Sequence, residues 1–321
     1  MSALVITGAS SFLGHASLSK LPAERFPELR LLVHNRPAPE FSADRRVITV
    51  HGNLLDRETF RDLVTAGSTV VHLAYLATPY PEENNMAAAR NLLAACREAG
   101  IRRLIHCSTA VVAGSIPDDI VNEATECRPA NDYEAAKFAV EKLVLEAGGR
   151  DLEATVLRPT AVFGPGGKNL VKLAEDLLRQ PRIVNYARSC LQGRRTMNLV
   201  HVDNVVAALA FLIDTPRDIG GEVYIVSDDE SPLNNYRDVE HRLAQGLGIP
   251  NYPLPPIAMP RSALALALKA AGRTNTNTNR VYDGSKLLKA GLKKPVPLEE
   301  GLASFASWYR SRPAGATGSD P

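Results

Sequence analysis

The 321-residue sequence contains few cysteines and no cluster of cysteine and histidine. Disulfide frameworks and zinc sites need closely spaced ligands, and no C-x-x-C pair occurs. The pattern therefore favours reduced, buried thiols in a cytoplasmic protein. The seven histidines are scattered without metal-ligand spacing, so no metal site is expected. The four cysteines lie within or beside apolar stretches, at Cys96, Cys107, Cys127 and Cys190.

A strong excess of charge, a signal peptide and a membrane-length apolar run are also lacking. The net charge of +2 gives no field that would attract nucleic acid or a membrane surface. The first apolar run begins at Ala3 with no basic region before it. The longest later run, from Ser262 to Ala271, is too short to span a bilayer and predicts a buried helix. We expect neither a nucleic-acid partner nor a membrane partner.

Short apolar runs alternate with helical patterns through the first half of the chain. Regular alternation of this kind predicts βαβ units and a doubly wound parallel sheet, an α/β fold of the Rossmann type. The apolar runs show no polar alternation, which indicates a sheet covered on both faces. The expected strands lie within 4–8, 28–34, 44–54, 68–74, 102–109 and 153–159, and the helices within 15–24, 56–67, 84–100 and 132–148.

The pattern loosens after Pro159, which suggests a second unit that is discontinuous in sequence. We expect a dinucleotide-binding domain over 1–165, with later strands near 198–203 and 222–227 returning to its sheet. A smaller substrate lobe should then occupy most of 166–310. The end of the chain, 311–321, has little to bury and is expected to be disordered.

The first strand runs into TGASSFLG, a glycine-containing turn at the start of a helix. In a dinucleotide loop the first glycine makes the tight turn and the last allows close packing of helix on strand. Ser11 stands where the middle glycine would normally let the backbone approach a pyrophosphate. Its small hydroxyl can itself donate to a phosphate oxygen. The cofactor-binding candidates in this turn are Gly8, Ser10, Ser11, Phe12, Leu13 and Gly14.

The second expected strand is followed by His34, Asn35 and Arg36, with no acidic residue to accept the ribose hydroxyls of NAD. A guanidinium suits the geometry of a 2′-phosphate, so Arg36 favours NADP(H), while NAD(H) stays open. After the third strand, Asn53 and Leu54 are candidates for the adenine side of the site.

Tyr133 and Lys137 are four residues apart on an expected helix and therefore share one face. A nearby ammonium favours a phenolate and lowers the pKa of a tyrosine, which would allow Tyr133 to exchange a proton with a substrate oxygen. Thr109 ends a strand upstream, at the edge where α/β sheets bind ligands. Its hydroxyl can hold a reacting carbonyl against Tyr133, with Ser108 beside it.

These motifs, in this order, resemble the extended short-chain dehydrogenase/reductases of the NAD-dependent epimerase/dehydratase type, almost end to end. The resemblance implies Thr109, Tyr133 and Lys137 as catalytic residues, and a homodimer built on the helices that hold 85–99 and 133–146. STAVVAG is similar to the family's S-S-x-x-V-Y-G, with Ala113 in place of tyrosine. Further cofactor positions implied by the family's segments are Leu73, Ala74, Tyr75, Asn85, Pro159 and Val162.

The family implies ketone and alcohol chemistry at a nicotinamide, with several outcomes. Ala110 and Val111 replace the acidic pair of the 4,6-dehydratases, and neither can transfer a proton. Reduction of a 4-keto nucleoside-diphosphate sugar is the leading hypothesis, with Arg194, Arg195 and Arg280 as cations for its pyrophosphate. The alternatives are an NAD-retaining 4-epimerase or an enzyme like the 3β-hydroxysteroid dehydrogenases, acting on an apolar substrate. A non-catalytic cofactor-binding regulator is the least favoured.

Overall fold

The computed structural model describes residues 3–21, 25–34, 44–77, 81–257 and 277–312. Asn35 and Arg36, the apolar run at 262–271 and the chain end beyond 312 lie outside the described residues, so the expectations placed on them are not examined by the structure. None of the helices formed by the described residues combines the length and apolarity that crossing a membrane requires.

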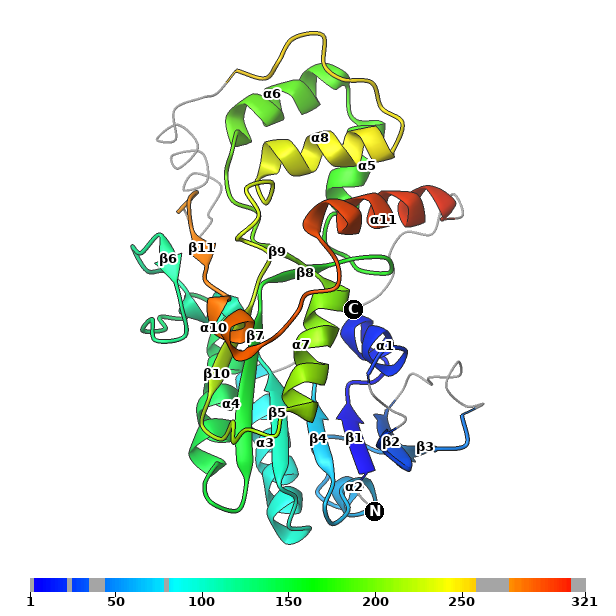
Figure 1. Ribbon diagram of the computed structural model, residues 1–321, viewed down its shortest axis with the longest axis vertical. Helices are drawn as coiled ribbons and strands as arrows, with labels where there is room; N and C mark the ends of the chain where they lie inside the picture. The colour runs from blue at the N-terminus through cyan, green and yellow to red at the C-terminus, as the bar shows by residue number, and fades with distance from the viewer. Residues whose placement is uncertain (1–2, 22–24, 35–43, 78–80, 258–276, 313–321) are drawn as a thin grey trace.

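The main sheet has seven parallel strands in the order β10-β7-β5-β4-β1-β2-β3 (Figure 1). This arrangement confirms the expected doubly wound α/β fold of the Rossmann type. Every residue of β1, β5 and β7 is buried, because helices cover both faces of the sheet. The strands are β1 (Ala3–Thr7), β2 (Glu28–Val33), β3 (Val47–His51), β4 (Thr69–His72), β5 (Arg103–Cys107), β7 (Glu153–Pro159) and β10 (Val223–Val226).

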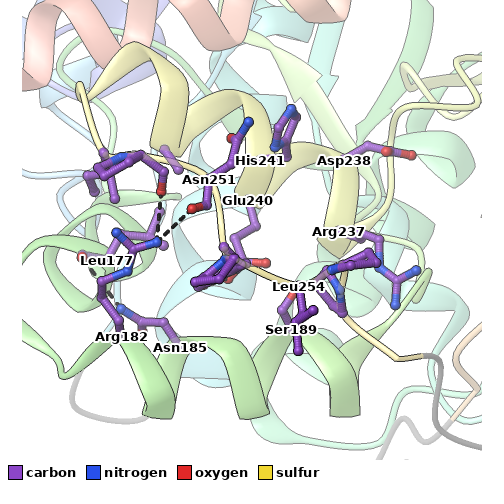
Figure 2. A pocket seen from close by; sticks show the side chains of 17 residues that line it. Leu177, Arg182, Asn185, Ser189, Arg237, Asp238, Glu240, His241, Asn251 and Leu254 are labelled. Carbon is purple, nitrogen blue, oxygen red and sulfur yellow. Dashed lines mark hydrogen bonds between the residues drawn. The ribbon is translucent and has the colours of Figure 1, made fainter.

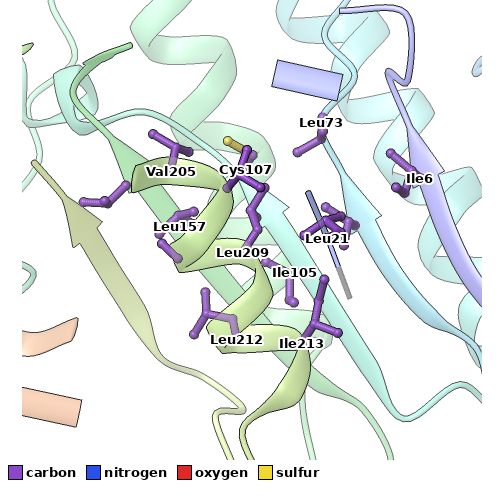
Figure 3. Close-up of a cluster of buried hydrophobic side chains, with 14 of the residues drawn as sticks. Ile6, Leu21, Leu73, Ile105, Cys107, Leu157, Val205, Leu209, Leu212 and Ile213 are labelled. Atoms are coloured by element: carbon purple, nitrogen blue, oxygen red, sulfur yellow. The ribbon is translucent and has the colours of Figure 1, made fainter. Parts of the chain in front are cut away.

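Two apolar clusters fill the space between the sheet and its helices. On one face Leu209 and Leu212 of α7 (Val202–Asp214) pack against Ile105 and Leu157 of the sheet (Figure 3). The opposite face is covered by α2 (Thr59–Leu63), α3 (Pro81–Glu98) and α4 (Asp132–Ala147). A short helix, α1 (Phe12–Leu18), follows β1 and packs beside α7.

A C-terminal lobe stands above the carboxyl edge of the sheet (Figure 1). Its core includes Phe163, Leu177, Val239 and Phe305 and is separate from the two clusters of the sheet. The lobe's helices are α5 (Val171–Arg179), α6 (Arg182–Gln192), α8 (Tyr236–Gly246) and α11 (Leu298–Ser311), while α10 (Ser285–Ala290) lies against β10. Since α11 includes Ser311, the helix ends one residue inside the segment expected to be a disordered tail.

One of the two late strands does not rejoin the main sheet. The segment near 222–227 forms β10, which pairs with β7 as expected. The segment near 198–203 forms β9 (Leu199–His201), which pairs with β8 (Ala161–Phe163) in a separate two-stranded sheet. The expectation for β9 was wrong, because β9 pairs with β8, the short strand that follows β7, outside the main sheet. A second small sheet joins β6 (Ile120–Val121) to β11 (Val281–Tyr282).

Candidate active site

The site lies at the carboxyl edge of the sheet, where the chain leaves β1, β4 and β5. In an α/β sheet this edge is where ligands bind. The glycine turn follows β1, the segment Leu73–Tyr75 follows β4, and Ser108 and Thr109 follow β5. Parallel pairing of the three strands therefore brings three sequence motifs to the same edge.

The geometry of the turn after β1 explains why positions 8 and 14 are glycines. Gly8 has a φ of +77°, and a Cβ there would approach the backbone nitrogen of Ala74 to 2.7 Å. A Cβ on Gly14 would lie 2.3 Å from the carbonyl oxygen of Gly8. Because neither position has room for a side chain, both glycines are needed for α1 to pack against the strand ends.

Ser11 is the N-cap of α1. Its Oγ accepts a hydrogen bond from the backbone nitrogen of Gly14 at 3.1 Å, which stabilises the first turn of the helix. The hydroxyl hydrogen stays available, since a hydroxyl both donates and accepts. Ser11 therefore replaces the middle glycine of the motif while the turn is kept, and its side chain stabilises α1 as the N-cap.

The turn fits the phosphates of a dinucleotide. Among the described residues, no hydrogen-bond acceptor faces the backbone N–H groups of Phe12 and Leu13 at the start of α1. Unpaired N–H donors of this kind are suited to anionic oxygens. Phe12 and Leu13 would supply backbone donors, and Ser10 and Ser11 would supply hydroxyls.

The segment after β4 is held by Asn85 of α3. The Asn85 amide accepts from the Leu76 nitrogen at 2.9 Å and donates to the carbonyl oxygens of Leu76 and Pro81 at 2.7 and 2.6 Å. Both amide hydrogens are thus used within the chain. Asn85 was expected to bind cofactor; in the structure its side chain positions the loop after β4, and the cofactor contact stays a prediction. Asn85 thereby shapes the loop that presents Ala74 and Tyr75.

The expected catalytic side chains gather at the start of α4. Lys137 is buried and donates to the carbonyl oxygen of Cys107 at 3.1 Å, and its Nζ lies 5.0 Å from the centre of the Tyr75 ring. The rings of Tyr75 and Tyr133 meet edge to face at 5.1 Å. Tyr133 is 42% exposed and reachable by a substrate. Thr109 is the N-cap of the 3₁₀ helix η3 (Ala110–Ala113).

The pKa of Tyr133 departs from the expectation. Burial raises it to about 12, the Cys107 thiol adds to the rise, and the neighbouring Thr109 side chain opposes it. Lys137 was expected to lower this pKa, but its ammonium is directed to the Cys107 carbonyl and the Tyr75 ring. Burial in turn lowers the pKa of Lys137. At neutral pH the Tyr133 phenol therefore carries its proton, so the side chain is a proton donor rather than a base.

A pair of buried histidines lies beneath these groups and was missed from the sequence. His72 of β4 and His106 of β5 are register partners, and their rings stack at 5.2 Å. The His72 Nδ1 is 2.6 Å from the Thr7 hydroxyl oxygen. Burial lowers the pKa of both rings, that of His72 to about 3. The available signal was that His72 is the last residue and His106 the last but one of two successive strands that are otherwise largely apolar.

Arg280 was expected to meet a substrate pyrophosphate, and the structure corrects this. Its side chain is 2% exposed and donates to the carbonyl oxygens of Gly114 and Ile116, each at 2.6 Å. Gly114 has a φ of +66°, and a Cβ there would overlap the Arg128 carbonyl oxygen at 1.7 Å. Arg280 therefore fixes the loop that follows η3 and Thr109, and it is not a surface cation.

The other predicted residues lie at or near the ends of the strands or, for Arg194 and Arg195, in the C-terminal lobe after α6. Ser108 is buried, and its Oγ has no hydrogen-bond partner within the described part of the chain. Arg194 is exposed and lies 3.6 Å from Asp238, whereas the partly buried Arg195 bonds to Gln192. Asn53 and His34 are exposed at the ends of β3 and β2, Leu54 and Val162 are partly buried, and Pro159 is buried at the end of β7.

The fold and the glycine turn are those of a dinucleotide-binding protein of the Rossmann class. Residues 4–227 match the model of the NAD dependent epimerase/dehydratase family, and the chain belongs to that family. The comparison confirms the resemblance inferred from the motifs. The catalytic type is therefore that of an NAD-dependent epimerase/dehydratase-type oxidoreductase.

Two curated relatives are ketone reductases. The chain is 31% identical over 231 residues, covering 70% of it and 67% of the relative, to the 4-hydroxy-2-methyl-3-oxo-4-farnesyl-3,4-dihydroquinoline-1-oxide ketoreductase of Stigmatella aurantiaca. It is 28% identical over 328 residues to the 2-alkyl-3-oxoalkanoate reductase of Stenotrophomonas maltophilia, covering 97% of this chain and 92% of the relative.

Solved structures share the fold at lower identity. A double mutant of DesIV, the dTDP-glucose 4,6-dehydratase of Streptomyces venezuelae solved with NAD, superposes with a TM-score of 0.72 at 21% identity over 97% of each chain. The shared fold therefore includes the C-terminal lobe as well as the Rossmann-type domain.

Proposed function

We propose that the protein is an NAD(P)-dependent oxidoreductase that reduces a ketone on a largely apolar substrate to a secondary alcohol, with Tyr133 as the proton donor. The observation that carries this proposal is the burial of the Arg280 guanidinium, whose Nη1 and Nη2 atoms donate to backbone carbonyl oxygens, so that one of the three predicted phosphate-binding arginines is used by the fold. NADP(H) is the proposed cofactor, on the strength of Arg36 in the sequence.

The substrate class is supported by the site and by the relatives. Arg194 is exposed beside Asp238. Met197 lies just before β9, at the position where we would expect an arginine in a sugar-nucleotide epimerase. A substrate pyrophosphate needs charge-assisted hydrogen bonds that these positions supply poorly. The two ketone reductases above act, by their names, on a farnesylated quinoline and on an alkylated oxoalkanoate. Both names describe substrates with large apolar parts.

The nicotinamide, when bound, supplies the hydride that reaches the carbonyl carbon. The phenol of Tyr133 would give its proton to the carbonyl oxygen, which completes the secondary alcohol. A pKa of about 12 keeps this proton in place at neutral pH. Thr109 would hold the oxygen beside Tyr133, and Lys137, buried against the Cys107 carbonyl, would face the cofactor ribose.

The test is a reduction assay with the purified chain, NADPH or NADH, and two substrate types. We expect turnover of a long-chain 3-oxo ester or a 3-oxosteroid, and at most weak turnover of a nucleoside-diphospho-4-keto sugar. Tyr133→Phe should lose activity by about two to four orders of magnitude while keeping cofactor affinity. Tyr309→Phe, on α11, is the matched control and should stay active.

Preferential reduction of the sugar nucleotide would refute the substrate class and restore the first hypothesis from the sequence. Full activity of Tyr133→Phe would refute the assigned proton donor. Stoichiometric NAD released from the denatured protein would instead favour an epimerase that retains its cofactor.

A further inference from the structure

The C-terminal lobe contains a cavity of about 410 Å³ that none of Thr109, Tyr133 and Lys137 lines. It lies between α5, α6, α8 and the segment 249–256 (Figure 2). The volume falls in the range of small-molecule sites. Its wall is mostly apolar, formed by Leu177, Ala244, Ile249, Leu254 and the prolines at 250, 253, 255 and 256.

The segment that closes the cavity is fixed rather than loosely placed. Arg182, at the start of α6, donates from Nη2 to the carbonyl oxygens of Pro250 and Asn251 at 3.2 and 2.7 Å, as Figure 2 shows. The Tyr252 ring meets Tyr186 of α6 edge to face at 5.4 Å. These contacts hold the wall opposite α8 in position without filling the space.

Two donors of one arginine in the cavity lack a hydrogen-bond partner within the described part of the chain, although the Glu240 carboxylate lies near enough to act on its charge. The Nε and Nη2 atoms of Arg237 are buried and have no hydrogen-bond partner among the residues the structure describes. Its backbone nitrogen bonds to the Gly193 carbonyl, which anchors the residue in the first turn of α8. Leaving charged donors buried and unpaired is costly, and native structures rarely do it without a ligand or water.

The acidic groups of the same cavity are already engaged. Glu240 is 3% exposed and accepts a hydrogen bond from the Tyr252 hydroxyl at 2.9 Å, and burial raises its pKa. Asp238 lies 3.6 Å from Arg194 at the rim. A dianion such as a phosphate would be repelled by both carboxylates more strongly than a monoanion, and Arg182, the other arginine of the lining, is already used on the carbonyl oxygens of Pro250 and Asn251. A monoanion with an apolar body matches the cavity better.

We propose that this cavity binds an amphipathic monocarboxylate, whose carboxylate accepts hydrogen bonds from Arg237 and whose apolar body fills the space toward Leu177, Ala244 and Ile249. The planar fork of a guanidinium suits a carboxylate in this way. The site is separate from the catalytic residues, and the inference does not depend on the proposed reaction.

The probes are decanoate and its neutral counterpart decanol, titrated calorimetrically into the full chain. Wild type and the matched control Arg61→Met, an exposed arginine of α2, should bind decanoate equally. Arg237→Met should weaken decanoate binding by about tenfold or more, whereas Arg237→Lys should retain part of it. Decanol should bind wild type more weakly than decanoate and should not distinguish Arg237→Met from wild type.

Filling the cavity provides the second measurement. Ala244→Trp should abolish decanoate binding, with cofactor binding used to show that the variant is folded. The proposal is overturned if wild type shows no saturable decanoate binding, or if Arg237→Met binds decanoate as wild type does. Unchanged decanoate binding in a folded Ala244→Trp protein would place the ligand elsewhere and also overturn it.

Discussion

Mild acid should destabilise the protein through His72. This ring is 4% exposed, its Nδ1 lies 2.6 Å from the Thr7 hydroxyl, and burial followed by the Lys137 charge lowers its pKa to about 3. An unfolded histidine titrates near its ordinary pKa of about 6.5. Below that pH the unfolded chain binds a proton at this histidine and the folded protein does not, so the free energy of unfolding decreases as the pH falls.

The size of the effect follows from the two pKa values. At about pH 5 the unfolded histidine is almost fully protonated and the folded one is neutral, which removes about 2 kcal/mol of stability relative to neutral pH. His72→Gln keeps a polar group beside Thr7 but removes the titration. Urea unfolding of both proteins at about pH 7 and about pH 5 should show a pH-dependent loss smaller by about 2 kcal/mol in the variant.

His106 titrates in the same direction, because burial also lowers its pKa. It remains in both proteins, so the difference between them isolates His72 to a first approximation. Equal pH dependence in wild type and His72→Gln would refute the assignment of this buried ring as a neutral group.

Three further outcomes follow from the site. With a reduced cofactor, the kcat/KM for ketone reduction should stay flat to about pH 10, because the pKa of Tyr133 is about 12; a decline centred near neutrality would contradict this. Ser11→Ala should lower the free energy of unfolding by about 1 kcal/mol through loss of the N-cap, whereas Ser11→Gly should cost only a few tenths. Arg36→Ala should weaken NADPH binding about tenfold or more and leave NADH binding unchanged in parallel titrations.

The main sheet could be predicted from the sequence because its strands carry an unusual pattern. Leu4–Thr7 is apolar up to its last residue and proves buried throughout, and Glu153–Pro159 proves buried on every residue although it contains three polar side chains. The C-terminal lobe gave weaker signals. Leu199–His201 reads as a strand, but three residues contain no information about the partner strand. That partner, Ala161–Phe163, was not predicted as a strand at all.

The residues of the site could be predicted better than their electrostatics. Helical spacing placed Tyr133 and Lys137 on one face, and their positions beside Tyr75 agree with it. Spacing along one helix could not show that Lys137 would donate to the Cys107 carbonyl, since β5 is brought there only by the tertiary fold. The pKa of a tyrosine depends on such contacts and on burial, and neither can be predicted from a local sequence motif.

The contacts of the buried arginines could not be predicted from the sequence either, and they decide which arginines could bind a substrate phosphate. Arg103 pairs with Glu153 and donates to carbonyl oxygens at the end of α7, and Arg158 pairs with Glu141 in the interior. Arg280 joins them by holding the loop after Thr109. Each of these cations has its charge committed to the fold, so counting arginines in the sequence overestimates what a phosphate could meet. The buried Arg280 therefore argues against a pyrophosphate clamp at that position.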